Sequence, residues 1–64
     1  MLRQLRAARK SAGMTQVDAA RALRRTQAFI SKCELGERRI DPIDLQDFAA
    51  LYLQPVAFFL PALS

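Results

Sequence analysis

Several residue types that build catalytic and metal sites are missing from this chain of 64 residues. Histidine and tryptophan are absent, and Cys33 is the single cysteine. Without histidine there is no His-based general acid or base and no Ser–His or Cys–His nucleophile pair, and one thiol does not make a zinc site within one chain. One cysteine also excludes an internal disulfide. We therefore expect no enzyme, no metal and no cofactor.

Long apolar runs are missing as well. The longest apolar stretch, around residues 56–63, is interrupted by Pro61 and is far shorter than the roughly 20 residues that a membrane-spanning helix needs. The basic N-terminus is not followed by the apolar core of a signal peptide. We expect neither a membrane nor a small-molecule substrate among the partners.

What the sequence does contain is charge that is unevenly distributed. Residues 1–39 hold all ten Lys and Arg residues and three acidic ones, a net charge of +7, whereas residues 40–64 hold three Asp residues and no basic residue, a net charge of −3. A small domain polarised in this way is suited to a polyanion on one side.

The apolar periodicity is helical throughout, and Thr, Val and Ile are too sparse for strands. Residues that favour the start or the end of a helix recur along the chain. The starts are Thr15, Thr26, Asp41-Pro42 and Pro55, and the stops are Gly13 and Gly36. These signals predict a compact all-α bundle of five helices that forms one domain over residues 1–64.

The second and third predicted helices are separated only by Arg24, Arg25 and the Thr26 cap. So tight a turn forces two short helices to cross steeply and leaves the outer face of the second one exposed, as in a helix-turn-helix. That face carries Gln27, Ala28, Ser31 and Lys32. Glutamine can bond an adenine edge twice, lysine can reach guanine, and a small residue can pack on a thymine methyl. Phosphate contacts are expected around it, from Thr15 and Gln16 and from Glu37-Arg38-Arg39.

Three fragments stand at a spacing that belongs to one family: Gly13-Met14-Thr15-Gln16, Ile30-Ser31-Lys32 and Glu34-Leu35-Gly36-Glu37-Arg38-Arg39. From Leu5 to about Leu60 the chain resembles the phage repressor/Cro-type (XRE family) helix-turn-helix domains. The resemblance implies a lambda-repressor-like DNA-binding fold with the helix-turn-helix at helices 2 and 3. It also implies a cytoplasmic protein of prokaryotic or phage origin.

The resemblance also assigns roles to individual residues. The expected base-reading residues are Gln27, Ala28, Ser31 and Lys32. The expected DNA-backbone residues are Thr15, Gln16, Arg25, Thr26, Phe29, Arg38 and Arg39. Phe29 is equally compatible with the core and with the DNA-facing surface. Arg9 and Glu34 match a pair that ties the first helix to the end of the recognition helix, which would explain an arginine on the inward stripe of Leu2, Leu5 and Ala12.

Three positions depart from the family pattern. Arg24 stands where the inter-helix turn usually has glycine, and a left-handed conformation there would cost a residue with a Cβ roughly 1 kcal/mol. Arg25 replaces a buried aliphatic residue, so we expect it to keep its head in water or to contact phosphate. Leu53 replaces another turn glycine and leaves the end of the fourth helix open.

The C-terminal segment is too apolar for so small a core. Some of its large side chains should be exposed and should form a dimer interface. The expected interface residues are Phe58, Phe59, Leu60 and Leu63.

The sequence thus predicts a double-stranded DNA-binding transcriptional regulator of the repressor kind that acts as a homodimer on a palindromic operator. An antitoxin-like or controller protein that binds a second protein through the C-terminal face, and a pure protein-interaction module, are the alternatives.

Overall fold

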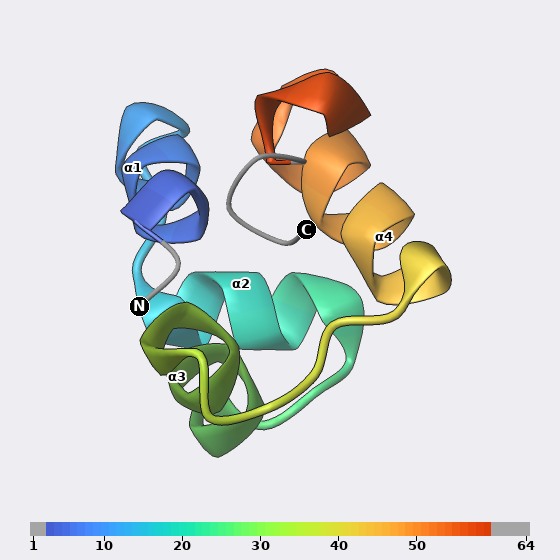
Figure 1. Ribbon diagram of the computed structural model, residues 1–64. Coiled ribbons are helices and arrows are strands. Elements are labelled where there is room, and N and C mark those ends of the chain that lie inside the picture. The colour runs from blue at the N-terminus through green and yellow to red at the C-terminus, as the bar shows by residue number, and fades with distance from the viewer. Residues whose placement is uncertain (1–2, 60–64) are drawn as a thin grey trace.

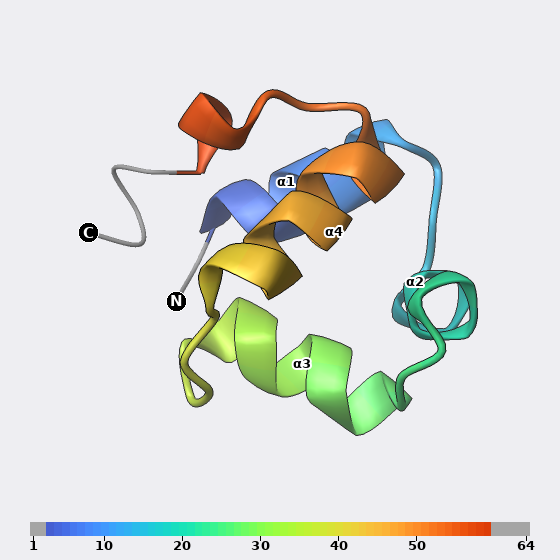
Figure 2. The ribbon, with the colours of Figure 1, turned by 90° about the vertical axis from the view of Figure 1, so that its right-hand side faces the viewer.

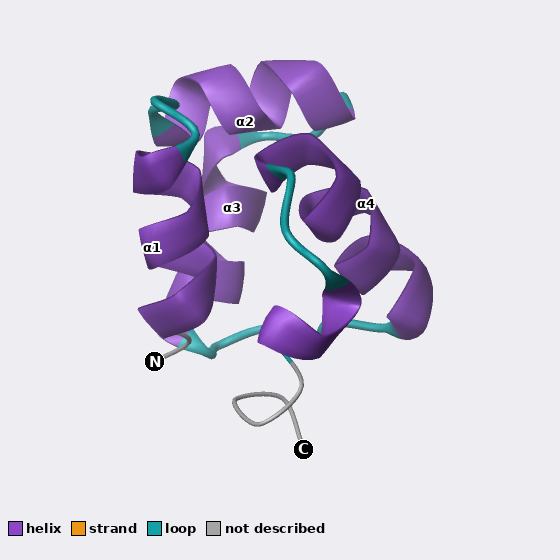
Figure 3. Ribbon diagram, turned by 90° about the horizontal axis from the view of Figure 1, so that it is seen from above, coloured by secondary structure: helices purple, strands orange, loops and turns teal. Residues whose placement is uncertain are grey.

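Four α-helices follow one another in residues 3–59, the part of the chain that the computed structural model describes (Figure 1). A single 3₁₀ turn comes after them, and the described range contains no strand (Figure 3). The elements are α1 (Arg3–Ser11), α2 (Gln16–Leu23), α3 (Gln27–Leu35), α4 (Pro42–Tyr52) and η1 (Val56–Phe58). The all-α prediction is confirmed. The predicted fifth helix is wrong, because only three residues after Pro55 form the short 3₁₀ turn.

The helices begin where side chains can accept the first backbone N–H groups. The Thr15 hydroxyl accepts from the Asp18 N–H (3.1 Å) while the Thr15 N–H donates to the Asp18 carboxylate (3.0 Å), a complete capping box. The Thr26 hydroxyl accepts from the Phe29 N–H (3.1 Å), and Asp41 accepts from the Asp44 N–H (2.8 Å). All three predicted caps are confirmed.

The inter-helix turn is built without glycine. Arg24 ends α2 at φ 57° and Leu53 ends α4 at φ 58°, both in the left-handed region. In the left-handed conformation the N–H of Arg24 reaches the carbonyl of Arg21 (3.3 Å) and the N–H of Arg25 reaches the carbonyl of Ala20 (2.8 Å), so two carbonyls in the last turn of α2 are satisfied. Arg24 and Leu53 thus adopt the left-handed backbone conformation that glycine usually adopts, and each has the conformational strain that a Cβ adds there.

The short turn sets how α2 and α3 meet. Figure 1 shows the two helices together at one end of the molecule, with α1 and α4 beyond them. In Figure 2 α2 is seen along its axis while α3 lies across the view, so the two cross steeply. Both α1 and α4 pack on this pair, α1 against α3 and α4 against α2, and η1 folds back on α4. The arrangement is that of a helix-turn-helix on a helical support.

One core joins all the elements. Its largest fully buried side chains are Phe48, Phe59, Leu5, Ile30 and Cys33. Small residues on α2, Ala19 and Ala20, are buried where it meets its neighbours. Burial in this core raises the pKa of the Cys33 thiol to about 11. The thiol therefore stays neutral at physiological pH and behaves as a small apolar residue.

The structure corrects two predictions of whether a side chain is buried or exposed. Phe59, expected in an exposed patch, is 1% exposed, because the 3₁₀ turn directs its ring into the core. Ala12, expected on the inward stripe, is exposed, because α1 ends before it and Ala8 takes the buried place. Leu2, Leu60 and Leu63 lie outside the described residues.

Candidate nucleic-acid interface

The outer face of α3 carries the expected base-reading residues. Gln27, Ala28 and Lys32 are exposed, and Ser31 is half-buried beside them. The opposite face of the same helix buries Ile30, Cys33 and Glu34. Since the buried face fixes the rotation of α3 about its axis, the outer residues project from a rigid support.

A buried ion pair anchors the far end of α3 to α1. The Nε of Arg9 donates to Glu34 Oε2 at 2.6 Å, and its Nη2 donates to Oε1 at 3.2 Å. A third bond runs from Arg9 Nη1 to the carbonyl of Met14 at 3.0 Å. Arg9 is 8% and Glu34 5% exposed. The hydrogen bonds to Glu34 raise the pKa of Arg9 further above its ordinary value. Arg9 and Glu34, expected to pair, therefore lie in a bidentate contact of the kind that fixes geometry.

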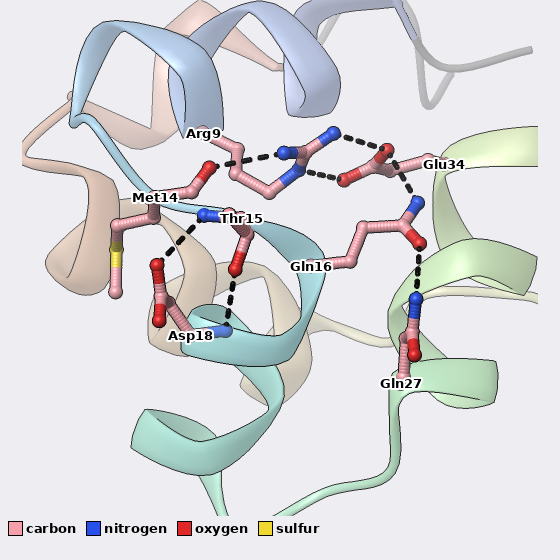
Figure 4. Close-up of polar contacts among 7 residues, drawn as sticks. All are labelled: Arg9, Met14, Thr15, Gln16, Asp18, Gln27 and Glu34. Atoms are coloured by element: carbon pink, nitrogen blue, oxygen red, sulfur yellow. Dashed lines mark hydrogen bonds and ion pairs between the residues drawn. The ribbon is translucent and has the colours of Figure 1, made fainter.

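This pair continues into two glutamines, as Figure 4 shows. Gln16 Nε2 donates to Glu34 Oε1 at 3.2 Å, and Gln27 Nε2 donates to Gln16 Oε1 at 3.4 Å. The chain of contacts runs from the interior to the exposed start of α3. Because an amide has two N–H donors and two lone pairs on its oxygen, Gln27 keeps an N–H and its carbonyl oxygen for a partner. The network thus orients the side chain that the sequence singled out first.

The start of α2 lies beside this network. Gln16 is the first residue of α2, and Thr15 is its cap. The hydrogen bond from the Thr15 backbone N–H holds the pKa of Asp18 below its ordinary value, so this carboxylate stays ionised in the first turn of the helix. Thr15 is exposed and Gln16 half-buried. The structure brings this helix start, proposed to touch the DNA backbone, next to the first turn of α3.

A basic groove lies beside the part of α3 that carries Ala28 and Lys32. We use this name for the groove lined by Arg24, Arg25, Thr26, Ala28, Phe29, Lys32 and Arg38. The Cζ of Arg25 lies 4.5 Å and that of Arg38 lies 4.8 Å from the centroid of the Phe29 ring. Arg25 Nη2 also reaches Asp44 Oδ1, on α4, at 3.4 Å. Four cations therefore meet on one surface, a composition suited to phosphate.

Two of these contacts could not be read from the sequence. Asp44, buried at the start of α4, is the partner of Arg25, and the carbonyl of Met14 is a partner of Arg9. The contact of Arg25 with Asp44 spans 19 residues and depends on how α4 packs, and the contact of Arg9 with Met14 depends on how the chain turns after α1. Arg39, expected in the phosphate set with Arg38, is exposed on the same loop.

Of the expected interface residues that the structure describes, Phe58 is exposed and Phe59 is buried. Phe58 is 38% exposed and packs edge-on against Phe59 at a centroid distance of 5.2 Å. Other large apolar side chains that are exposed, and that the sequence did not single out as exposed, are Val17, Leu35, Ile43, Leu53 and Val56. Leu53 stands out because its left-handed cap position leaves it 86% exposed.

No group of three or more His, Cys, Asp or Glu side chains in residues 3–59 is placed to hold a metal ion. In the same range, every helix is too short or too polar to cross a membrane.

A steeply crossed helix pair, an exposed second helix and a basic groove define a small all-α domain of the DNA-binding kind. Residues 1–57 match the family model described as a helix-turn-helix domain, and the chain belongs to that family. No match was found among curated proteins or among solved structures. Membership implies a DNA partner and suggests a DNA-binding regulator, and the family is typically non-enzymatic.

Proposed function

We propose that this chain is a sequence-specific, double-stranded DNA-binding transcriptional regulator of the phage repressor/Cro type, with a lambda-repressor-like fold over residues 1–64. The observation that carries the proposal is the network that ends at Gln27. An exposed glutamine held by a second glutamine, which is itself held by a buried carboxylate, loses little freedom when it meets a base. Such a side chain is suited to bidentate contact with adenine.

The remaining interface residues divide into two sets. Ala28, Ser31 and Lys32 read bases beside Gln27 in the major groove. The set that holds the DNA backbone is Thr15, Gln16, Arg25, Thr26, Phe29, Arg38 and Arg39. The support for this set is its placement around the two ends of α3, at the start of α2 and along the basic groove. These contacts position the domain, and the base contacts specify the site.

We further propose a cytoplasmic repressor that binds as a homodimer. One such domain offers one recognition helix, whereas a two-fold dimer places two of them on half-sites one helical turn apart. Phe58 is the described residue that favours an interface at the C-terminal end, because a large aromatic ring there remains partly exposed. Leu60 and Leu63 stay in the proposed interface, and Phe59 leaves it.

The experiment is selection from a randomised duplex library at about 0.15 M salt, followed by sequencing of the bound fraction. We expect an enriched inverted repeat with half-sites about 10 bp apart. An enriched site without two-fold symmetry would contradict the homodimer, and salt-sensitive binding without any enriched sequence would contradict sequence-specific regulation.

The Gln27→Ala variant tests the base-reading assignment on the selected site. We expect a loss of about 1–3 kcal/mol in preference at one base pair. Gln46→Ala, which alters an exposed glutamine on α4 outside the interface, is the matched control and should bind as the unaltered protein does. Equal weakening on every sequence would remove Gln27 from the base-reading set.

A further inference from the structure

Phe29 occupies an unusual place in the basic groove. It lies in the first turn of α3 and is half-buried. The guanidinium of Arg25, from the turn before α3, and that of Arg38, from the loop after α3, both lie over its ring, with Cζ 4.5 Å and 4.8 Å from the centroid. One aromatic ring thus contacts two arginines, one from each end of α3.

The repulsion between their positive charges would separate these two arginines. The two Cζ atoms lie 4.5 and 4.8 Å from the same centroid, so they are closer together than the Debye length of about 10 Å at 0.1 M salt, and the two positive charges repel. The negative face of an aromatic ring attracts each of them. The carboxylate of Asp44, 3.4 Å from Arg25 Nη2, adds a second attraction on one side. Phe29 and Asp44 therefore oppose a repulsion that would otherwise move the cations apart.

The ring itself is held by the core. Phe29 stacks against Phe48 with a centroid distance of 6.2 Å and an interplanar angle of 8°, and Phe48 is fully buried. The N–H of Phe29 is bonded to the Thr26 cap. A ring fixed at both backbone and side chain gives the arginines a rigid platform.

We propose that Phe29 is a positioning residue of the DNA interface that holds Arg25 and Arg38 as one phosphate-binding unit. A phenyl ring has no donor for a phosphate oxygen, whereas each guanidinium has five. A guanidinium that uses its face on an aromatic ring keeps the N–H groups of its edge free for phosphate. The inference rests on the proposed function. It changes the role of Phe29 from contact with the DNA backbone to action through its two neighbours.

The test compares Phe29→Leu with Phe29→Tyr on the selected duplex. Leucine keeps an apolar contact with Phe48 and removes the aromatic face, and tyrosine restores that face. The measurement is the slope of log Kobs against log salt, which changes by about 0.9 for each phosphate neutralised. We expect Phe29→Leu to reduce the magnitude of the slope by about 1 to 2 and to leave the base preference unchanged. Phe29→Tyr should keep the original slope. Thermal unfolding establishes that each variant is folded, and Phe29→Met replaces Phe29→Leu if leucine unfolds the domain.

A second measurement separates positioning from general damage to the fold. Arg25→Ala and Arg38→Ala should each lower the slope in the unaltered background and should have a smaller effect in the Phe29→Leu background, because the unit is already broken. An unchanged slope in Phe29→Leu, equal losses for leucine and tyrosine, or a changed preference at one base pair would overturn this inference alone. Failure of the unaltered protein to bind any duplex would overturn the proposed function and the inference with it.

Discussion

Two ion pairs in the described residues join the same kinds of side chain in different surroundings. In the pair of Arg9 and Glu34, the side chains are 10% and 6% exposed and the closest N–O distance is 2.6 Å. In the pair of Arg25 and Asp44, the arginine side chain is 46% exposed and the distance is 3.4 Å. The first arginine is committed to its carboxylate and to a backbone carbonyl, whereas the second keeps part of its guanidinium in solvent.

The difference separates structure from binding. The buried pair serves by fixing how α1 and α3 meet, because three of the five Arg9 N–H groups are already bonded within the protein. A half-exposed pair contributes little to stability, and its arginine can exchange water for phosphate. In this small domain, one arginine–carboxylate contact fixes α3 against α1, and the other leaves part of the Arg25 guanidinium in solvent, where the proposed phosphate contact would form.

The largest expected effect comes from breaking the buried pair. Glu34→Gln leaves the Arg9 charge buried without a counter-charge, and we expect a loss of about 3–5 kcal/mol in the free energy of unfolding. A domain of this size has about 3–10 kcal/mol in total. Urea denaturation measures the change, with Glu37→Gln, an exposed carboxylate in the loop after α3, as the matched control.

A double variant sharpens this result. Arg9→Met combined with Glu34→Met removes both charges, and we expect it to be much more stable than Glu34→Gln because no charge is stranded. If the single and double variants lose the same stability, the cost does not come from an uncompensated charge.

Tyr52 tests the same region with a neutral polar group. Its hydroxyl is buried without a hydrogen-bond partner among the described residues. An unsatisfied buried group costs about 1–3 kcal/mol, so Tyr52→Phe should raise the free energy of unfolding by an amount up to that cost. The stacking against Phe48, at 5.8 Å, is kept. A loss of stability would show that the hydroxyl has a partner.

Tyr52 also gives a pH dependence. Burial raises its pKa to about 12 from an ordinary value of 10.0. Between these values the unfolded chain loses the proton and the folded chain keeps it, so stability falls as the pH rises from about 10 to 12. Tyr52→Phe should make this decline shallower in urea titrations at several pH values. Cys33, with a pKa of about 11, contributes a decline of the same sign that remains in the variant.

The helices could be predicted from the sequence because the hydrogen bonds that start them join residues that are close together in the chain. Thr15, Thr26 and Asp41 cap the helices that follow them, and the tight turn alone required α2 and α3 to cross steeply. The exposed face of α3 followed from its buried face. Neighbouring residues such as Phe58 and Phe59 were harder to assign, because a three-residue turn has too little periodicity to show which ring faces inward.

The basic groove could be predicted only in part. Arg25 and Arg38 were expected near phosphate, but their common platform on Phe29 and the role of Asp44 were not. These contacts depend on the path of the loop between α3 and α4 and on where α4 starts, which are tertiary features. Residue types and spacing identified the two arginines, and only the fold showed which side chains hold them in place.

The smallest expected effect concerns the exposed pair and completes the comparison. A double-mutant cycle of Arg25→Gln and Asp44→Asn should give a coupling free energy of about 0.2–1 kcal/mol in urea denaturation. At 1 M salt, where the Debye length falls to about 3 Å, most of this coupling should vanish. The cost of Glu34→Gln should persist there, because a buried pair is screened much less. A coupling above about 2 kcal/mol, or one that is insensitive to salt, would mean that Arg25 is bound to Asp44 as firmly as Arg9 is to Glu34. In that case Arg25 would not be available to phosphate, and the division between a structural and a DNA-facing ion pair would fail.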